Sequence, residues 1–262
     1  MRKPIVAGNW KMYKTRDEGI HFVYDVNDEV PDKDVVETVI CAPSILLRCL
    51  TRRQGENLRI GAQNMHYEEE GAYTGEISPS MLSSTGVTYC IIGHSERRQF
   101  NGETETDVNL KLKAALKHHI IPIVCVGETK DQYEHADTDY ILGLQVKLAL
   151  KDISIEDIPN IVIAYEPIWA VGAKQAAPTD LANAKCGFIR KIIAKTYNKE
   201  VANQIRILYG GSVNKTNFRE LIRQEHVDGA LLGRASLDSN HFLEICQMAV
   251  DYVKEVEKGQ AE

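Results

Sequence analysis

The sequence predicts an α/β fold: a closed (β/α)8 barrel of parallel strands, built as a single domain over residues 1–262. Short apolar runs recur at intervals of roughly 20 to 40 residues, with longer mixed segments between them. Most runs are continuously apolar rather than alternating, which is typical of strands buried on both faces of a parallel sheet. The expected strands are residues 4–8, 36–42, 58–63, 89–93, 120–127, 161–165, 206–210 and 229–233.

The segments between these runs have the periodicity of helices. The clearest helical patterns lie in residues 105–117, 179–196 and 239–256. In the first of them, Val108, Leu112 and Ala115 recur near one face, with lysines elsewhere. An open doubly wound sheet is the alternative, but the sequence has no GxGxxG motif, and its eight strand–helix units suit the barrel. Periodicity by itself does not prove that the sheet closes.

Composition narrows the classes of function. The chain has 262 residues and a formal net charge of -6, unlike the basic footprint of a nucleic-acid-binding protein. It has no apolar run of about 18 residues that could span a membrane. The N-terminal MRKPIVAGNWKM lacks the long apolar stretch and the cleavage site of a secretory signal. None of the six cysteines forms a CxxC pair, so we expect reduced cysteines in a cytoplasmic protein. From the charge and the lack of a membrane span, we expect no nucleic-acid or membrane partner.

Polar residues gather directly after the expected strands. Active sites of (β/α)8 barrels lie at the C-terminal ends of the strands, so these residues are candidates for function. In chain order they are Asn9, Trp10, Lys11, Gln63, Asn64, His94, Ser95, Glu96, Glu128, Glu166, Gly210, Gly211, Ser212, Gly233 and Arg234. The opposite ends of the strands carry no comparable set.

Several of these residues also have a structural interpretation. Lys11 alone could be a surface lysine, and His94 alone could be a helix-start histidine bonded to backbone. For Glu96 and Glu128 we expect structural ion-pair partners. The candidates are Arg97, Arg98 and Lys11. A metal site is disfavoured, because His94 and Glu96 lie two residues apart and do not face each other on a helix.

Considered together, the same residues suit proton transfer next to a carbonyl in a phosphorylated substrate. A carboxylate such as Glu166 can remove a carbon-bound proton. A neutral imidazole such as His94 can donate to the carbonyl oxygens, and the ammonium of Lys11 can stabilise the resulting enediolate. Glycine-rich loops after strands seven and eight can present backbone N–H groups to a phosphate.

Many runs of the chain resemble the triosephosphate isomerase family. They are AGNWKM (7–12), CAPS (41–44), GAQNMH (61–66), GAYTGEIS (71–78), IIGHSERR (91–98), CVGET (125–129), AYEPIWAVG (164–172), ILYGGSV (207–213) and VDGALLGRASL (227–237). So many matches in the right order are specific, and they cover nearly the whole chain. The resemblance implies a TIM barrel that interconverts dihydroxyacetone phosphate and glyceraldehyde 3-phosphate, as in glycolysis and gluconeogenesis, without cofactor or metal.

The resemblance also implies roles for the residues at this end of the barrel. Glu166 is implied as the base that moves a proton between C1 and C2, and His94 as the neutral electrophile, a pairing known from the family. Lys11 is implied as the electrostatic partner, Asn9 as a group that positions the substrate, and Glu96 as a supporting acid near Lys11. The implied phosphate-binding N–H groups belong to Gly172, Ser212, Gly233 and Arg234.

The resemblance further implies a homodimer that forms through the loop 66–76, HYEEEGAYTGE. This loop is similar to the family's long third loop, which inserts into the neighbouring subunit. Thr74 would then approach Asn9 and Lys11 of the partner subunit. The structural alternative is an exposed, mobile loop.

The lid segment departs from the family pattern. Where the family commonly reads AIGTGKTA, this chain reads AVGAKQAA, so that Lys174 replaces a glycine. A positive φ would be costly for a side chain there. Pro178 also comes one residue early, and we predict that the next helix uses Thr179 as its N-cap, with Asp180 in the first turn. We still expect the lid to close over the substrate and exclude water.

Two further departures lie nearer the expected phosphate site. Arg234 replaces the second glycine of a pair, and this cation could strengthen phosphate binding, admit a bulkier substrate or point outward, which we expect. Tyr13 stands where the family more often has a small polar residue, and we attach no function to it. A related isomerase of four-carbon ketose phosphates is therefore one alternative. A phosphosugar-binding protein without catalysis is another, which the intact polar set disfavours.

Overall fold

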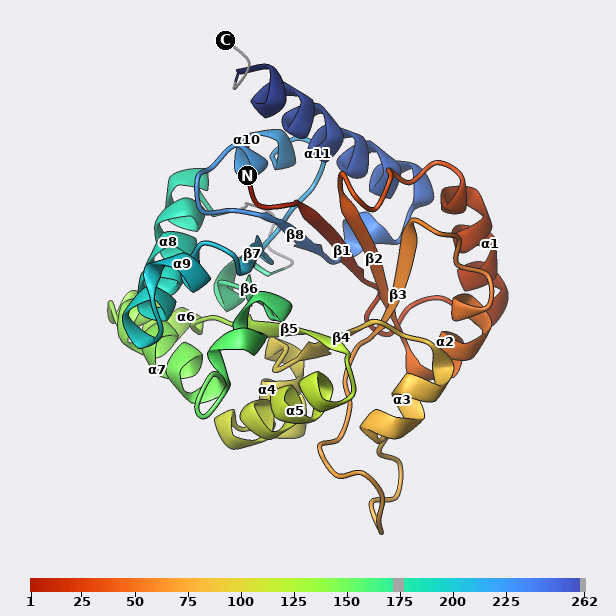
Figure 1. Ribbon diagram of the computed structural model, residues 1–262, viewed down its shortest axis with the longest axis horizontal. Coiled ribbons are helices and arrows are strands. Elements are labelled where there is room, and N and C mark those ends of the chain that lie inside the picture. Colours follow the sequence, from red (N-terminus) through yellow and green to blue (C-terminus); the bar gives the residue numbers. More distant parts are fainter. Residues whose placement is uncertain (172–176, 260–262) are drawn as a thin grey trace.

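The computed structural model describes residues 1–171 and 177–259. In these residues, parallel strands form a closed barrel in the order β1 to β8, and β1 pairs with both β2 and β8 (Figure 1). The predicted barrel is therefore confirmed, and the open sheet is excluded. The strands are β1 (Ile5–Asn9), β2 (Glu37–Ala42), β3 (Leu58–Ala62), β4 (Tyr89–Ile92), β5 (Ile121–Val126), β6 (Val162–Tyr165), β7 (Arg206–Tyr209) and β8 (Gly229–Leu232).

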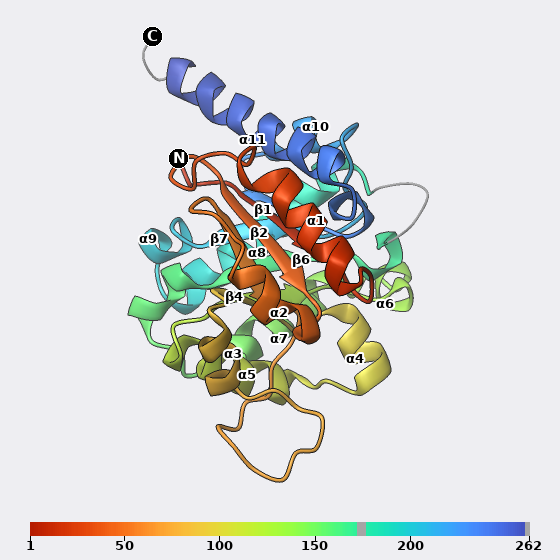
Figure 2. The same cartoon turned by 90° about the vertical axis from the view of Figure 1, so that its right-hand side faces the viewer.

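Helices surround the barrel (Figures 1 and 2). They are α1 (Arg16–Asn27), α2 (Ser44–Thr51), α3 (Pro79–Thr85), α4 (Ser95–Asn101), α5 (Glu105–Lys117), α6 (Lys130–Glu134), α7 (Thr138–Ala149), α8 (Thr179–Thr196), α9 (Lys199–Ala202), α10 (Phe218–Ile222) and α11 (Ser239–Gly259). Three 3-10 helices are η1 (Ile155–Asn160), η2 (Ile168–Ala170) and η3 (Arg234–Ser236). Within the described part of the chain, no helix is both long enough and apolar enough to cross a membrane.

The bounds of the elements follow the sequence patterns closely. Every strand begins and ends within one residue of its predicted position, and α5 and α8 have the predicted bounds. The predicted N-cap of α8 is wrong, because Thr179 is the first helical residue and Pro178 is the N-cap. Proline fixes its own φ, and the extended backbone of Pro178 (φ -55°, ψ 141°) lets the helix begin at the next residue. Asp180 lies in the first turn as expected.

The buried side chains form two layers. Alternate strand residues fill the barrel interior and make one apolar cluster: Ile5, Ala7, Val39, Cys41, Tyr89, Ile91, Ile123, Cys125, Val162, Ala164, Leu208 and Leu231. The intervening strand residues, such as Val6, Ile40 and Ile163, belong to a larger cluster that also includes the inner faces of the helices. Because both faces of each strand are buried, the strand sequences are continuously apolar rather than alternating.

The parallel barrel brings all strand C-termini to one end of the molecule, where the candidate site lies. One loop at this end bears on the predictions. The loop 66–76 projects from the body of the molecule (Figure 2). The altered lid residues Ala173, Lys174 and Gln175, and the predicted phosphate ligand Gly172, lie outside the described residues.

Candidate active site

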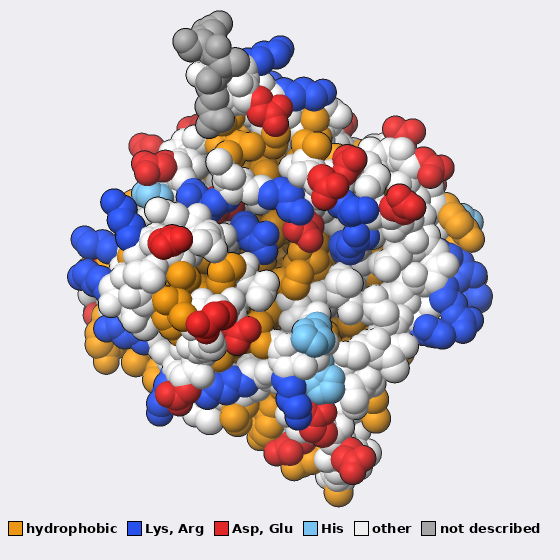
Figure 3. All heavy atoms as spheres, viewed as in Figure 1, with side chains coloured by type: hydrophobic (Ala, Val, Ile, Leu, Met, Phe, Trp, Pro, Cys, Tyr) orange, Lys and Arg blue, Asp and Glu red, His pale blue; other side chains and the backbone are white. Residues whose placement is uncertain are grey.

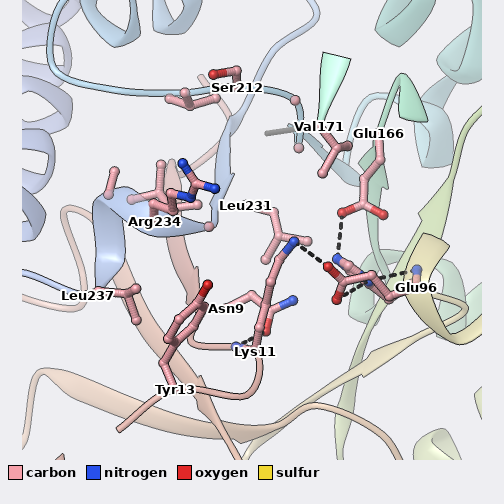
Figure 4. A pocket seen from close by; sticks show the side chains of 17 residues that line it. Asn9, Lys11, Tyr13, Glu96, Glu166, Val171, Ser212, Leu231, Arg234 and Leu237 are labelled. Atoms are coloured by element: carbon pink, nitrogen blue, oxygen red, sulfur yellow. Dashed lines mark hydrogen bonds and ion pairs between the residues drawn. The ribbon is translucent and has the colours of Figure 1, made fainter. Parts of the chain in front are cut away.

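A cavity of about 450 Å³ opens at the C-terminal ends of the strands. The residues that line it are Asn9, Lys11, Tyr13, His94, Glu96, Glu166, Val171, Gly210, Gly211, Ser212, Val213, Leu231, Leu232, Gly233, Arg234, Ala235 and Leu237 (Figure 4). Every described residue that we predicted as catalytic or substrate-binding is among them. Residues far apart in the sequence therefore converge on one pocket.

Glu166 follows β6 directly and is almost fully buried. Its backbone N–H donates to the carbonyl of Val126 at 2.8 Å, which continues the β5–β6 pairing by one residue. Glycines make room for it on both sides: a Cβ on Gly127 would lie 1.8 Å from the Glu166 carbonyl oxygen, and one on Gly210 would lie 2.7 Å from its Cγ. A side chain at position 127 would displace the backbone of Glu166, and one at position 210 would displace its side chain.

His94 is the N-cap residue of α4. Its Nδ1 accepts a hydrogen bond from the backbone N–H of Glu96 at 3.2 Å, so the proton of the neutral ring lies on Nε2. Nε2 in turn lies 3.1 Å from Oε1 of Glu166. The other carboxylate oxygen of Glu166 accepts from the backbone N–H of Ser95 at 3.4 Å. The imidazole is thus oriented with its Nε2 donor toward the carboxylate of Glu166.

The pKa values of this buried pair are coupled. Burial by itself would raise the pKa of Glu166, but His94, the Ser95 N–H and Lys11 stabilise the carboxylate and hold the pKa below its ordinary value. Burial lowers the pKa of His94, yet the facing carboxylate outweighs it and raises that pKa overall. When Glu166 turns toward a substrate this contribution weakens, and burial and the helix N-terminus then favour the neutral ring.

Lys11 is held in place from several directions. Its Nζ lies 2.7 Å from Oε1 of Glu96, so the predicted partnership of Glu96 with Lys11 is confirmed. Its backbone N–H donates to Oδ1 of Asn9 at 2.9 Å, and its carbonyl accepts from Nε2 of Gln63 at 3.0 Å. The backbone of Lys11 has a positive φ of 51°, which these contacts support. The ammonium therefore projects from a rigid turn into the pocket.

The expected ion-pair partners of Glu128 are wrong. Its Oε1 accepts hydrogen bonds from Nε1 of Trp169 at 2.8 Å and from the hydroxyl of Tyr165 at 3.2 Å. Burial raises its pKa, against the effect of these donors. The reason is the strand register, which pairs Val126 with Tyr165 and so places Glu128 beside the end of β6. Arg97 and Arg98 pair instead with Glu103 and Glu105.

Sequence patterns missed several residues of the site. Arg234 lines the pocket, so the expectation that it points outward is wrong. Tyr13, to which we attached no function, also lines it, as do Val171, Leu231 and Leu237. Leu231 could have been found from strand alternation, because it shares the inward face of β8. Nothing in the local sequence indicates the direction of Tyr13.

Among the residues that the structure describes, no three His, Cys, Asp or Glu side chains gather in a way that could hold a metal ion. The chain was also compared with models of known protein families. The model described as "TIM: Triosephosphate isomerase" matches residues 4–249, which is nearly the whole chain. The family's enzymes are isomerases, and the fold and pocket described above agree with that membership. The chain belongs to the triosephosphate isomerase family.

Proposed function

We propose that this chain interconverts dihydroxyacetone phosphate and glyceraldehyde 3-phosphate, with Glu166 as the catalytic base. The observation that carries the proposal is the convergence of three groups on one pocket: the buried Glu166 carboxylate, the Nε2–H of His94 and the Nζ of Lys11. These are the groups that an enediolate reaction requires.

In the proposed reaction, Glu166 removes a proton from C1 of dihydroxyacetone phosphate. The electrons of that C–H bond form the C1–C2 double bond, and the electron pair of the C2 carbonyl moves to its oxygen. The Nε2–H of His94 donates to this oxygen, and Lys11 stabilises the negative charge. His94 gives its Nε2 proton to the C2 oxygen and takes up the proton of the C1 hydroxyl, so the neutral ring is restored. Glu166 returns its proton to C2 while the oxygen on C1 becomes the carbonyl. Asn9 orients the substrate, and Glu96 holds Lys11 in place.

The substrate has to replace hydrogen bonds that Glu166 now makes. Its carboxylate oxygens contact Nε2 of His94 and the N–H of Ser95, and both contacts stabilise the ionised, weakly basic form. Turning toward C1 removes the carboxylate from these donors and makes it a stronger base. The proposed phosphate ligands are the N–H groups of Ser212, Gly233 and Arg234, which line the pocket, together with Gly172.

A second candidate function is isomerisation of a four-carbon ketose phosphate. The observation that favours it is Arg234, a long cationic side chain that lines the pocket where the family usually has glycine. A coupled assay that compares kcat/KM for the triose and tetrulose phosphates separates the two candidates. We expect the triose phosphates to react faster. Faster turnover of the tetrulose phosphate would favour the second candidate. No turnover of either substrate would indicate a phosphosugar-binding protein without catalysis.

We also propose that the chain is a homodimer that forms through the loop 66–76. Beside the active-site pocket lies a second hollow of about 410 Å³, and both are lined by Asn9 and Lys11. Large apolar side chains are exposed on the same part of the molecule: Met12 is 94% exposed, Ile45 87% and Phe100 73%. Exposed apolar surface of this kind is typical of an interface. We place the dimer in the cytosol, a proposal that its six free cysteines support.

A further inference from the structure

Two side chains that the proposed reaction does not use lie together on one wall of the active-site pocket. Arg234 is the first residue of η3, and Tyr13 lies in the loop between β1 and α1. Both line the pocket, and Tyr13 is 51% exposed. Figure 4 shows them on the side of the pocket opposite Glu166, with Lys11 between. A guanidinium and a phenol hydroxyl thus face the space that the substrate enters.

The charge of Arg234 is available to a ligand. Among the described residues that line the pocket, the basic side chains are Lys11 and Arg234. The ammonium of Lys11 is engaged by Glu96 at 2.7 Å. The guanidinium of Arg234 makes no hydrogen bond or ion pair to any described residue. An anion in this pocket can therefore pair with Arg234 without breaking an existing ion pair to a carboxylate.

The wall that carries these side chains is anchored to the barrel. The carbonyl of Ser236 in η3 accepts from Nε1 of Trp10 at 3.0 Å, and its Oγ donates to the carbonyl of Gly233 at 2.8 Å. On the other side, Lys14 has a positive φ of 70° and its Nζ lies 5.3 Å from the centre of the Trp10 ring. Trp10 thus contacts the segments that hold both residues, so their backbones are positioned before a ligand binds.

We infer that Tyr13 and Arg234 form a side-chain phosphate grip, added to the backbone N–H groups of the glycine-rich loops. The guanidinium presents parallel N–H donors that match two oxygens of a phosphate dianion, and the tyrosine hydroxyl can donate to a third. This inference rests on the proposed function and refines it. Arg234 stands at the second glycine of the pair in the family pattern described above, so the grip is a departure from that pattern.

Binding of inorganic phosphate, measured by isothermal titration calorimetry, tests the grip without requiring catalysis. We expect Arg234→Gly to weaken binding about tenfold or more, because a charge-assisted hydrogen-bonded pair is lost. Arg234→Lys should lie between the two, since an ammonium keeps the charge without the planar fork. Tyr13→Phe should weaken binding by a smaller factor. The affinity of the wild-type protein should also fall more steeply with salt than that of Arg234→Gly.

The matched control is Arg52→Met, which removes an exposed arginine at the end of α2, away from the pocket. It should bind phosphate as the wild-type protein does. Equal phosphate affinity in the wild-type protein and Arg234→Gly, or an equal loss in Arg52→Met, would overturn the grip.

Steady-state kinetics separates this inference from the proposed function. If both hold, Arg234→Gly raises the KM for triose phosphates by a larger factor than it lowers kcat, because Arg234 lies on the side of the pocket opposite Glu166. If the wild-type protein turns over no triose phosphate, the proposed function fails, while the phosphate titration still decides the grip.

Discussion

At the scale of single residues, the site depends on a carboxylate that is buried and yet kept ionised. Glu166 is 2% exposed, and burial without partners would favour its neutral form. The Nε2–H of His94 and the N–H of Ser95 offset that cost. In the proposed reaction, Glu166 is ionised before the substrate binds and becomes a stronger base when it turns away from these two donors.

Shortening this base tests its role. Glu166→Asp withdraws the carboxylate by one carbon. The neighbouring Gly127 and Gly210 have no side chains that could reposition the shorter residue. We expect kcat to fall by at least about 100-fold, because a general base must reach its proton at hydrogen-bond distance. The measurement is kcat with glyceraldehyde 3-phosphate in a coupled assay. An unchanged kcat would remove Glu166 from the reaction.

Glu103 is a second buried carboxylate, and its environment predicts a pH dependence of stability. It accepts hydrogen bonds from the backbone N–H of Gly93 at 2.8 Å, from Arg97 at 2.8 Å and from Lys111 at 2.7 Å. Burial would raise its pKa, but Lys111 and the other donors hold it below the ordinary value. The stabilisation is therefore present above the pKa of an unfolded glutamate and is lost as pH falls through the lower pKa of the folded state.

Replacing this carboxylate separates its contribution from general acid unfolding. At pH 7, Glu103→Gln should lower the free energy of unfolding by about 3 kcal/mol, since Lys111 loses its buried partner. Below the pKa of Glu103 the difference from the wild-type protein should shrink. Urea denaturation at several pH values measures both. A difference that stays constant down to the acid range would show that the charge of Glu103 has no part in stability.

At the scale of elements, the short 3-10 helix η2 follows β6 and precedes in sequence the segment that we expect to act as a lid. In η2, Trp169 donates its Nε1–H to Glu128 at 2.8 Å and stacks on Tyr133, with ring centres 4.4 Å apart. Glu128 also accepts from Tyr165, the last residue of β6. This network ties η2 to β5, β6 and α6, so the residues of η2 have a defined position.

Removing one donor should loosen this element. Trp169→Phe keeps a stacked ring but leaves Glu128 with one donor fewer, and we expect a loss of about 1–2 kcal/mol in the free energy of unfolding. Tyr133→Phe is the control, because it keeps the stacked ring and should change stability by less than about 0.5 kcal/mol. Chemical denaturation of both variants checks the pair. A loss for Trp169→Phe no larger than that of the control would mean that the hydrogen bond to Glu128 contributes little to holding η2.

At the scale of the whole molecule, side chains cover both faces of the barrel strands, while the loop 66–76 projects from the body (Figures 2 and 3). Glu69 in this loop pairs with Lys117 at 2.6 Å and with His118 at 2.8 Å, near the end of α5. His66 lies between the rings of Tyr67 and Tyr73, each 4.5 Å away. The loop thus has contacts of its own that shape it before a partner binds.

The proposed dimer can be tested at the tip of this loop. Thr74→Arg should weaken dimerisation at least about 100-fold, because a cation without a partner would be buried in the interface. Analytical ultracentrifugation over a range of concentrations measures it. Thr196→Arg makes the same change at the end of α8 and should leave the dimer intact. A wild-type protein that sediments as a monomer would contradict the proposal directly.

Sequence patterns predicted most of the fold and many of the residues that line the site. The strands agree to within one residue because their apolar runs are short and end at polar or glycine residues. Asn9, Lys11, His94 and Glu166 could be selected because each follows a strand. Glu128 follows a strand in the same way, yet it lies outside the pocket, because position after a strand does not specify which way a side chain turns.

The sequence by itself determined the eight strand–helix units, the end of the strands at which the site lies, and the family resemblance, while the structure decided that the sheet closes. These follow from periodicity and from motifs, which are local properties of the chain. Only the tertiary structure decided the partners of Glu96 and Glu128, the cap of α8 and the place of Tyr13 and Arg234 on one wall of the pocket. Such contacts join residues distant in sequence, so strand register and packing set them, and no local pattern records them.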